Sequence, residues 1–599
     1  MKRWYKYIKP YLPYFIIGPL CMIVEVVGEV IMPKFLAMII DYGVKNGEEI
    51  ETTSPFAEKM LGYFGENWAF IVAIMVGMIL TAILMMIGGV GGAYFGTKAS
   101  VNFAADLRAD LYGKVQRYSF ANIDHFSTGS LVTRLTNDVT QLQNFVLMML
   151  RMALRSPGML IGGLIMAILT SPKLSIVLAI SVPLLIISIA FFIWKGFPRF
   201  SAVQGKIDGL NSTVQENVTN VRVVKSFVRE DFEKKKFAKA NGELKKTGMS
   251  AMMMIIMISP VMSFFMNATT IAVMWFGGNM VANNTGMSTG DLTAFITYIT
   301  QILFSLMMVT MLFMQLSRAL ASGKRIAEVL DEKLDISDEN AAYPELTVEK
   351  GEVEFKNVSF RYYKNSEEKV LDGINFKIDA GETVGIIGST GCGKTTIVSM
   401  IPRLYDVDEG EVLIDGVNVR DYSLYNLREG VGMVLQKNVL FSGTVADNLR
   451  WGDENADIAT LRAAAVSAQA DAFVSAQTDG YDHSIEQGGA NVSGGQKQRL
   501  CIARALLKKP KILILDDSTS AVDMATEARI REAFRETLED TTKIIIAQRI
   551  NSVMEADKII VVNEGQITGI GTHQELLAEN VEYQEIYNSQ MDRKEGDAQ

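Results

Sequence analysis

The stretch of residues 388–396 has the residue types and the spacing that hold a triphosphate. It comprises Gly388, Ser389, Thr390, Gly391, Cys392, Gly393, Lys394, Thr395 and Thr396. Glycines let successive backbone N–H groups curve around an anion, and a helix that follows points its positive end at that anion. Lys394 would reach the β- and γ-phosphates, and the Thr395 hydroxyl would be a Mg²⁺ ligand. The stretch therefore predicts a nucleoside triphosphate site with Mg²⁺.

The elements on either side of this stretch fit a phosphate-binding loop. Residues 383–387 form a short apolar run typical of a buried strand, and residues 396–401 favour a helix. Further strands are expected at 353–362, 511–516 and 543–547, with helical stretches between them. Strands that alternate with helices predict an α/β nucleotide-binding domain.

The composition of the chain indicates that part of it lies in lipid. At 599 residues the chain is too long for one core, and it is 49% apolar with 33 methionines. Its cysteines, Cys21, Cys392 and Cys501, form no disulfide or zinc pattern, which indicates a reducing cytosolic face. The net charge of −9 argues against nucleic acid as a partner.

Long apolar segments precede the loop. Each is near or above the length of about 20 residues that a helix needs to cross a bilayer. They cover roughly 11–40, 69–96, 148–170, 174–194, 251–282 and 292–316. The first ten residues mix basic and aromatic side chains, which suits a short interfacial helix. The sequence therefore predicts an all-α transmembrane domain of six helices.

The distribution of charge sets the expected orientation. The loop 41–66 is mostly acidic and is expected outside, whereas the stretch 195–246 is rich in lysine and arginine and is expected inside. Both termini are then cytoplasmic. The inside connections, 97–147 and 195–250, are long and helical in pattern, so we expect them to project into the cytosol as continuations of the spans.

Carboxylates interrupt the first span. Glu25 and Glu29 are four residues apart and share one helix face. Because carboxylates in lipid are costly, they either line a transport path that attracts cations or pair with a neighbouring helix and fix the packing. The sequence leaves both interpretations open. In the run 252–257, four methionines favour lipid-facing or packing roles over a drug-binding wall.

The predicted domain boundaries follow the changes in composition. Residues 1–322 form the transmembrane domain with its cytoplasmic helical extensions, and residues 323–350 turn charged and form a linker. Residues 351–590 form the nucleotide-binding domain, and residues 591–599 form a charged tail.

The residues after the phosphate loop resemble one family. The octapeptide from Val492 to Arg499, VSGGQKQR, is similar to the signature of ATP-binding cassette (ABC) proteins, and it precedes the strand that ends in Asp516. Six spans ahead of such a cassette resemble an ABC exporter half-transporter of the multidrug type. The stretches 126–139 and 221–227 fit that subgroup. The resemblance covers nearly the whole chain.

The resemblance implies roles for further residues. Tyr362 matches the aromatic residue that stacks on adenine, and Gln436 matches the glutamine that contacts Mg²⁺. Asp516 matches the acidic residue that holds Mg²⁺ through water. Residues 520–523 match the loop that crosses the dimer interface. The implied ligands are ATP and Mg²⁺, with Thr395, Gln436 and Asp516 around the metal.

Two catalytic positions depart from the family pattern. Asp517 stands where the family has a glutamate that orients the attacking water. Loss of one methylene withdraws the carboxylate by about 1.5 Å, which costs on the order of a hundredfold in rate. Gln548 stands where the family has a histidine, and its amide can neither carry a positive charge nor shuttle a proton. We expect this site to bind ATP and to hydrolyse it poorly.

Cassettes of this family pair head to tail, so each ATP lies between the loop of one chain and the signature of the other. The signature residues are present here: Ser493, Gly494, Gly495 and Gln496. This favours a heterodimer whose partner supplies the glutamate and the histidine. The expected function is ATP-driven export of drug-like or lipid-like amphiphiles, with hydrolysis mainly at the composite site. The extensions near 122–128 and 208–215 would pass the cassette motion to the spans.

Other functions with this architecture remain open. A homodimeric exporter with two slow sites would need no partner, and brisk ATP hydrolysis by the chain alone would support it. A lipid flippase would show ATP hydrolysis stimulated by lipids rather than by drug-like cations. An ATP-gated channel or regulatory sensor would use ATP without net transport. Substrate uptake into inverted vesicles, with ATP and a partner present, would distinguish an exporter from it.

Overall fold

The computed structural model describes residues 2–43, 67–283, 285–363, 366–517 and 522–596. The chain divides into two compact units. The first comprises Met1–Lys114 with Gly129–Asp331, and the second comprises Val115–Thr128 with Glu332–Gln599. In the described residues the first unit is helical throughout, and the second unit holds the strands.

The first unit is a set of long helices. Its elements are α1 (Lys2–Ile8), η1 (Lys9–Tyr11), α2 (Leu12–Gly43), α4 (Asn67–Gln116), α6 (Thr128–Thr133), η2 (Arg134–Asp138), α7 (Val139–Met152), α8 (Arg155–Thr170), α9 (Ser175–Thr219), α10 (Val221–Ser226), α11 (Glu230–Ala282) and α12 (Thr289–Asp331). Among the described residues, six helical segments are long and apolar enough to cross a membrane. They are Arg3–Tyr42, Trp68–Gln116, Thr128–Thr170, Ser175–Thr219, Glu230–Ala282 and Thr289–Val309. The predicted six-helix transmembrane domain is confirmed.

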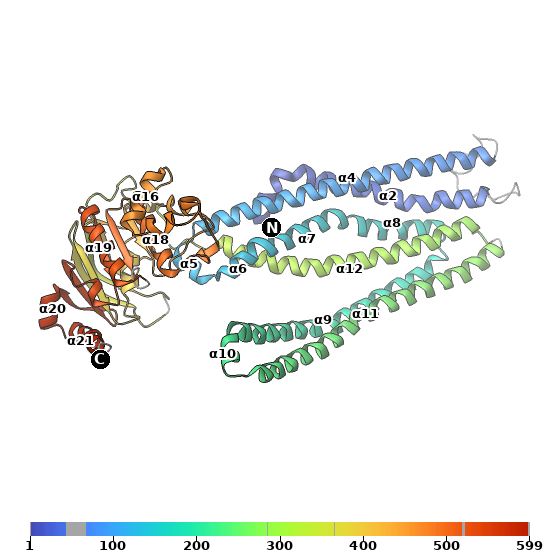
Figure 1. Ribbon diagram of the computed structural model, residues 1–599. Helices are drawn as coiled ribbons and strands as arrows, with labels where there is room; N and C mark the ends of the chain where they lie inside the picture. The colour runs from blue at the N-terminus through green and yellow to red at the C-terminus, as the bar shows by residue number, and fades with distance from the viewer. Residues whose placement is uncertain (1, 44–66, 284, 364–365, 518–521, 597–599) are drawn as a thin grey trace. The chain divides into compact units, whose positions relative to one another are not determined.

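α9 and α11 are both much longer than a bilayer is thick. α9 has 45 residues and α11 has 53, which makes each about 70 to 80 Å long against about 30 Å for the hydrocarbon core. Figure 1 shows them side by side, joined through α10. The tip of this helix pair is therefore α10. Residues 208–215, which were predicted to pass the cassette motion to the spans, lie inside α9.

Glycines on α4 let it approach α2 closely. A Cβ atom on Gly88 would lie 2.7 Å from the carbonyl oxygen of Cys21. Small residues on facing helices bring the two backbones together, so that dispersion contacts replace contacts with lipid. The carboxylate of Glu25 lies against Gly89, where an added Cβ would be 3.3 Å from Glu25 Oε2. This packing fixes the rotation of α2 and hence the face that carries its carboxylates.

α12 runs through the core of the first unit. Its buried side chains Phe295, Tyr298 and Ile302 belong to a cluster that includes residues of α2 and α8. The Tyr298 hydroxyl donates to the backbone oxygen of Val30 at 3.2 Å. A Cβ atom on Gly163 of α8 would lie 2.9 Å from Ile302 Cγ1. α12 is therefore held between α2 and α8.

α12 continues past the predicted domain boundary at residue 322 and ends at Asp331. Ile326 and Val329 are fully buried, and Arg325 pairs with the buried Asp138 of η2. The linker predicted from residue 323 thus begins after Asp331. Residues 323–331 are charged in composition, but their buried side chains recur at helical spacing and form one apolar helix face.

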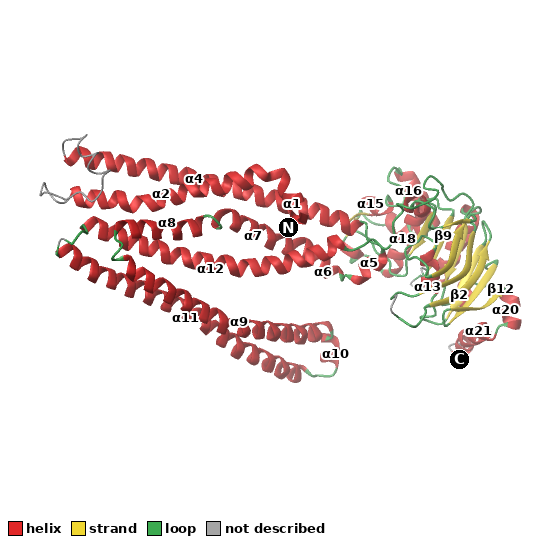
Figure 2. Cartoon of the chain, turned by 180° about the vertical axis from the view of Figure 1, so that it is seen from behind, coloured by secondary structure: helices red, strands yellow, loops and turns green. Residues whose placement is uncertain are grey.

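The second unit contains two main sheets, seen in yellow in Figure 2. Its strands are β1 (Val353–Phe360), β2 (Leu371–Ile378), β3 (Thr383–Gly388), β4 (Glu409–Ile414), β5 (Val417–Asn418), β6 (Val431–Val434), β7 (Gly443–Thr444), β8 (Ser484–Ile485), β9 (Ile512–Asp516), β10 (Thr542–Ile546), β11 (Lys558–Asn563) and β12 (Gln566–Gly571). The larger sheet has the order β12-β11-β3-β10-β9-β6 and is parallel except for β12. The smaller sheet, β2-β1-β4-β5, is antiparallel. The predicted α/β class is confirmed.

Short helices accompany these sheets. They are α5 (Phe120–His125), α13 (Lys394–Met400), α14 (Leu424–Glu429), α15 (Val445–Leu449), α16 (Ile458–Ser467), α17 (Asp471–Ser475), η3 (Gly480–Asp482), η4 (Gln487–Gly489), α18 (Gly494–Leu507), α19 (Met524–Thr537), η5 (Ile550–Ser552), α20 (His573–Glu579) and α21 (Val581–Gly596). α5 comes from the first predicted cytoplasmic extension, yet it belongs to the compact unit of the cassette. α21 continues into the residues predicted as a charged tail.

Candidate nucleotide site

The site lies at the carboxyl ends of three neighbouring parallel strands. β10 lies between β3 and β9, with Ile546 opposite Ile386 on one side and Asp516 on the other. The phosphate loop follows β3, Asp517 follows β9, and Gln548 follows shortly after β10. Parallel strands end at the same edge of a sheet, so the fold collects the predicted residues there.

The backbone of the loop requires glycine at two positions. Gly391 and Gly393 have φ angles of 86° and 103°, in the left-handed region that glycine adopts without strain. A Cβ atom on Gly393 would also lie 2.7 Å from a methyl carbon of Leu371. α13 begins directly after the loop, so its first N–H groups face it. This backbone fits an anion cradle.

Lys394 is folded onto the loop. Its Nζ donates to the backbone oxygen of Gly388 at 2.9 Å and to that of Ser389 at 2.7 Å. The buried Cys392 sulfur lies 3.6 Å from the same nitrogen. Charged phosphate oxygens bind an ammonium more strongly than neutral carbonyls do. Lys394 is therefore held close to where phosphate oxygens would replace its present partners.

The carboxylate of Asp516 fits a divalent cation. Its Oδ1 accepts a hydrogen bond from the Thr395 hydroxyl at 2.9 Å, whereas Oδ2 is buried with no hydrogen-bond partner among the described residues. Asp516 is 1% exposed, and burial raises the pKa of its carboxyl. A buried oxygen without a donor is costly, and Mg²⁺ prefers such oxygen ligands.

The described ranges contain no cluster of three or more histidine, cysteine, aspartate or glutamate residues that could hold an ion alone. Mg²⁺ commonly shares one or two protein ligands with substrate phosphates. Thr395 and Asp516 fit that arrangement, since both lie beside the phosphate loop.

The two departures from the family pattern contact each other. Gln548 Nε2 donates a hydrogen bond to Asp517 Oδ2 at 2.7 Å, and the Gln436 side chain also hydrogen-bonds Asp517. The N–H of Asp517 donates to the backbone oxygen of Ile546 at 3.0 Å, which fixes the residue at the sheet edge. Burial raises the pKa of Asp517, and the amide donors lower it. Burial is the larger effect, so the pKa of Asp517 lies above its ordinary value.

Tyr362 lies beside the helix that follows the loop. Its hydroxyl shares a hydrogen bond with Thr396 Oγ1 at 2.9 Å, and the residue is 42% exposed. The rings of Phe360 and Tyr405 meet it edge-on, with centroids 5.0 and 5.1 Å away. An exposed aromatic face next to a phosphate loop fits the predicted stack on adenine.

Tyr405 connects Tyr362 to α5, and sequence reasoning missed it. Its hydroxyl donates to Asp124 Oδ2 at 2.8 Å, and its ring lies 6.0 Å from that of Phe120. Burial raises the pKa of the Tyr405 hydroxyl, so it stays a donor. No local pattern reveals this contact, because it joins positions 281 residues apart. The predicted transmitting stretch 122–128 overlaps α5.

The signature starts a helix with an exposed first turn. The hydroxyl of Ser493 accepts from the N–H of Gln496 at 3.3 Å, and Gln496 Oε1 accepts from the N–H of Ser493 at 2.9 Å. This capping box begins the 14-residue α18, which continues through Gly494 and Gly495. Ser493 and Gly494 are exposed. The positive end of α18 thus faces outward, which suits an anion held by another chain.

Gln498 links the signature helix to the chain's own site. It is 1% exposed, and its Nε2 donates to the backbone oxygen of Asp517 at 3.4 Å. The next residue, Arg499, donates from Nη1 to the backbone oxygen of Gln469 at 2.8 Å. The sequence places Gln498 in the signature but gives no sign that it contacts the end of β9.

Part of two sequence predictions lies outside the described residues. Residues 518–521 include Ser520 and Ala521 of the predicted interface loop, and residues 44–66 hold most of the acidic outer loop. Asp523, in the same interface stretch, accepts from the N–H of Thr526 at 2.9 Å and caps α19.

In the first unit, both span carboxylates contact Arg155 at the start of α8. Arg155 Nη2 lies 3.2 Å from Glu25 Oε1 and 2.8 Å from Glu29 Oε1. This is the pairing partner that the sequence did not supply. The second oxygens, Glu25 Oε2 and Glu29 Oε2, are buried with no hydrogen-bond partner in the described part of the chain. Pairing with Arg155 therefore does not satisfy both carboxylates.

Family comparisons match both units. A model described as the ABC transporter transmembrane region matches residues 15–307, and one described as ABC transporter matches residues 371–520. This chain is an ABC exporter half-transporter. The family assignment makes it a multi-pass membrane protein that couples ATP hydrolysis to transport.

Bacterial relatives match the half-transporter over nearly their full length. It is 36% identical over 594 residues to the uncharacterized ABC transporter ATP-binding protein YfiB of Bacillus subtilis, covering 99% of each chain. It is 37% identical over 593 residues to the uncharacterized Rv1273c of Mycobacterium tuberculosis, covering 98% of this chain and 97% of the other. The uncharacterized YknU of Bacillus subtilis is 33% identical over 589 residues, with the same coverage.

Proposed function

We propose that this half-transporter is one subunit of a heterodimeric exporter whose own site holds ATP and hydrolyses it poorly. The observation that carries the proposal is the hydrogen bond from Gln548 Nε2 to Asp517 Oδ2 at 2.7 Å. Asp517 is shorter than glutamate, and the amide of Gln548 holds its carboxylate at the sheet edge, so it stands back from the position that a glutamate carboxylate would reach. The missing methylene withdraws the carboxylate by about 1.5 Å, which costs on the order of a hundredfold in rate.

The residues around bound ATP would divide binding from chemistry. The loop N–H groups and Lys394 would hold the phosphates, and Tyr362 would hold the adenine. Thr395, Gln436 and Asp516 would hold Mg²⁺, which when bound neutralises charge on the phosphate oxygens. Gln548 would offer γ-phosphate oxygens at most a neutral hydrogen bond, because an amide carries no charge and one of its two N–H donors is held by Asp517.

The signature would complete the ATP site of a partner half-transporter. The Ser493 hydroxyl and the exposed first turn of α18 offer donors to a γ-phosphate. A partner with the glutamate and histidine that this chain lacks would then hydrolyse ATP in the composite site. ATP that stays bound at the degenerate site would keep the cassettes in contact, since a ligand stabilises the state that binds it.

The proposed transport step is multidrug-type export of drug-like or lipid-like amphiphiles from the cytoplasm. ATP binding would close the cassettes, and α5 and α10 would pass this rigid-body motion to the spans. Access would switch from inside to outside, and hydrolysis with phosphate release would reset it. The basic character of 195–246 supports cytoplasmic termini and an inner-membrane location.

A homodimer is the second candidate. The intact capping box of Ser493 and Gln496 favours it, because two copies would supply two signatures for two slow sites. In that form the protein would be a lipid flippase, or an ATP-gated sensor without net transport.

A tandem fusion of two copies tests the heterodimer proposal. One half is wild type, and the other carries D517E and Q548H. In lipid nanodiscs, we expect this mixed fusion to release phosphate about a hundredfold faster than a fusion of two wild-type halves. The half with D517E and Q548H is the repaired half, and its ATP site uses the signature of the wild-type half. S493A in the wild-type half should therefore remove the gain in phosphate release, whereas S493A in the repaired half should preserve it. Equal rates for the mixed and wild-type fusions would contradict the proposal.

A further inference from the structure

Two cavities of the first unit adjoin along α12. One has a volume of about 400 Å³ and is lined by α9, α11 and α12. The other has a volume of about 330 Å³ and is lined by α2, α7, α8 and α12. Thr300 and Phe304 line both cavities, so these side chains stand between them. The cavities differ in chemistry, and that difference constrains what fills them.

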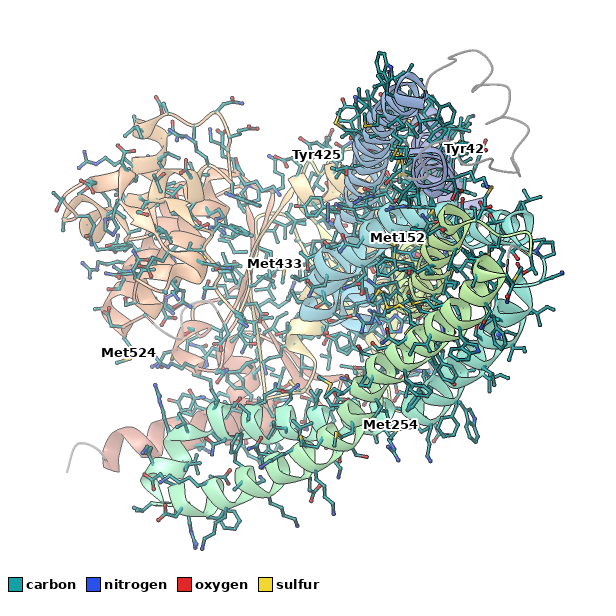
Figure 3. The ribbon with its side chains drawn as sticks, turned by 90° about the vertical axis from the view of Figure 1, so that its right-hand side faces the viewer. Tyr42, Met152, Met254, Tyr425, Met433 and Met524 are labelled. Carbon is teal, nitrogen blue, oxygen red and sulfur yellow. The ribbon has the colours of Figure 1, made fainter. Side chains whose placement is uncertain are left out.

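The smaller cavity has unpaired acceptors. Glu29, Arg155 and Gln301 line it, as does Met152, which is labelled in Figure 3. Gln301 Nε2 already donates to the backbone oxygen of Glu29 at 2.9 Å. Glu29 Oε2 and Gln301 Oε1 are both buried without a hydrogen-bond partner among the residues that the structure describes. Because both unpaired atoms are acceptors, the missing partner is a donor.

The missing donor is also positively charged. Arg155 is shared between Glu25 and Glu29, so one guanidinium faces two carboxylates. Arg151, one turn earlier, lies close enough to act on Glu25 electrostatically. Of the two carboxylates, only Glu29 lines the smaller cavity, so its second oxygen is the one that a bound cation can reach. An uncompensated carboxylate within a span is costly, and a cation with N–H groups would satisfy both its charge and its hydrogen bonds.

The larger cavity is apolar. None of its lining residues carries a charge, and four of them are methionines. These are Met262, Met266, Met307 and Met311. Methionine side chains are flexible and polarizable, so such a wall adapts to the shape of an alkyl or aromatic group. This cavity fits an apolar tail.

We propose that the joined cavities bind an amphiphile with one alkylammonium head that carries N–H donors. The ammonium would lie at Glu29 Oε2 and Gln301 Oε1, and the tail would pass Thr300 and Phe304 into the methionine-lined cavity. The inference rests on the proposed export function, since it names the substrate class of that function. Its binding step needs no ATP hydrolysis, so the two proposals fail separately.

Matched probes with one tail test the head group. The probes are n-dodecylammonium, n-dodecyltrimethylammonium and n-dodecanol, measured by equilibrium dialysis against the full-length chain in nanodiscs without ATP. Binding to empty nanodiscs is subtracted. We expect n-dodecylammonium to bind at least about tenfold more tightly than either analogue, because only it offers charged N–H donors. Affinity should rise by about fourfold per methylene from butyl- to longer alkylammonium until the apolar cavity is filled.

Variants then locate the site. E29Q should weaken n-dodecylammonium binding by about tenfold and n-dodecanol binding by less than about twofold. S263L, which adds bulk to the lining of the larger cavity, should weaken n-dodecylammonium binding and spare n-butylammonium. E243Q is the matched control, because Glu243 pairs with Lys206 on exposed helix surface. It should leave binding by all probes unchanged.

Three results would overturn the proposal. The first is equal affinity for n-dodecylammonium and n-dodecanol, which would indicate a neutral amphiphile. The second is displacement of n-dodecylammonium by millimolar Mg²⁺ at constant ionic strength, which would indicate an inorganic cation. The third is wild-type binding by folded E29Q. If E29Q does not fold, E29D and Q301M replace it: E29D should bind within about threefold of wild type, and Q301M should bind about threefold more weakly.

Discussion

Two regions of the cassette differ in how closely they follow the family pattern: the signature at the start of α18 and the catalytic positions at the ends of β9 and β10. At the start of α18, Ser493 and Gln496 form an intact capping box with an exposed first turn. At the ends of β9 and β10, Asp517 and Gln548 bond to each other. The phosphate loop has the glycines and the lysine, Lys394, that bind phosphate. The comparison teaches that the residues for nucleotide binding and the residues at the catalytic positions can change independently within one cassette.

The largest expected effect is loss of the signature hydroxyl. In the mixed fusion, S493A in the wild-type half, which supplies the signature to the repaired site, should lower phosphate release by about a hundredfold, to the rate of the wild-type fusion, because a preorganised donor is lost. S423A is the control, since Ser423 caps α14 through the N–H of Asn426 at 3.2 Å in the same way. S423A should cost about 1 kcal/mol of stability and little turnover. Equal losses of phosphate release from both variants would indicate that Ser493 acts only as a helix cap.

Repair of the catalytic edge should have the next largest effect. In the chain alone, D517E with Q548H should raise the single-turnover rate by about a hundredfold, because the carboxylate regains its reach and a histidine regains charge. Quenched-flow measurement of bound ADP gives the rate. Q477H with D479E makes the same side-chain changes at exposed positions and should change nothing. A repaired chain no faster than wild type would place the defect elsewhere.

Removal of the loop lysine should have a smaller effect on a different quantity. K394A should weaken ATP binding at this chain's site by about tenfold, because charge-assisted bonds to phosphate are lost. Turnover by the mixed fusion should fall by less, since its hydrolytic site uses the other loop. Isothermal titration with a slowly hydrolysed ATP analogue checks the affinity. K377A, at an exposed lysine paired with Glu352, is the control.

The smallest expected effect concerns the contact between the cassette and α5. Y405F removes the hydrogen bond to Asp124 and should lower transport-coupled turnover by about fivefold, equivalent to about 1 kcal/mol, with ATP affinity unchanged. A double-mutant cycle with D124N measures the pair. Additive effects of the two changes would show that the contact does not couple the residues. Y425F, at an exposed tyrosine, is the control.

Much of the fold and of the ATP site was predictable because its signals are local. β3, the loop and α13 are contiguous, and the apolar runs before Asp516 and Ala547 mark β9 and β10. The six spans follow from apolar length alone. α12 runs past residue 322, where the sequence predicted a domain boundary, because charged residues cover the outer face of a helix whose Ile326 and Val329 are buried.

The decisive side-chain contacts were not predictable because they join distant positions. Gln548 bonds Asp517 across 31 residues, and Arg155 reaches Glu29 across 126. Tyr405 reaches Asp124 across 281 residues. Which side chains meet depends on helix rotation and strand order, and one sequence does not reveal these. Residue types gave the chemistry that was available, and the fold determined which partner each group has.

The most direct test of the degenerate site is phosphate release by this half-transporter alone, reconstituted in lipid with ATP and Mg²⁺. We expect slow release, with the nucleotide bound at the phosphate loop recovered as ATP when the reaction is quenched. Rapid and sustained phosphate release without any partner chain would contradict it, because Asp517 and Gln548 would then be a competent catalytic pair.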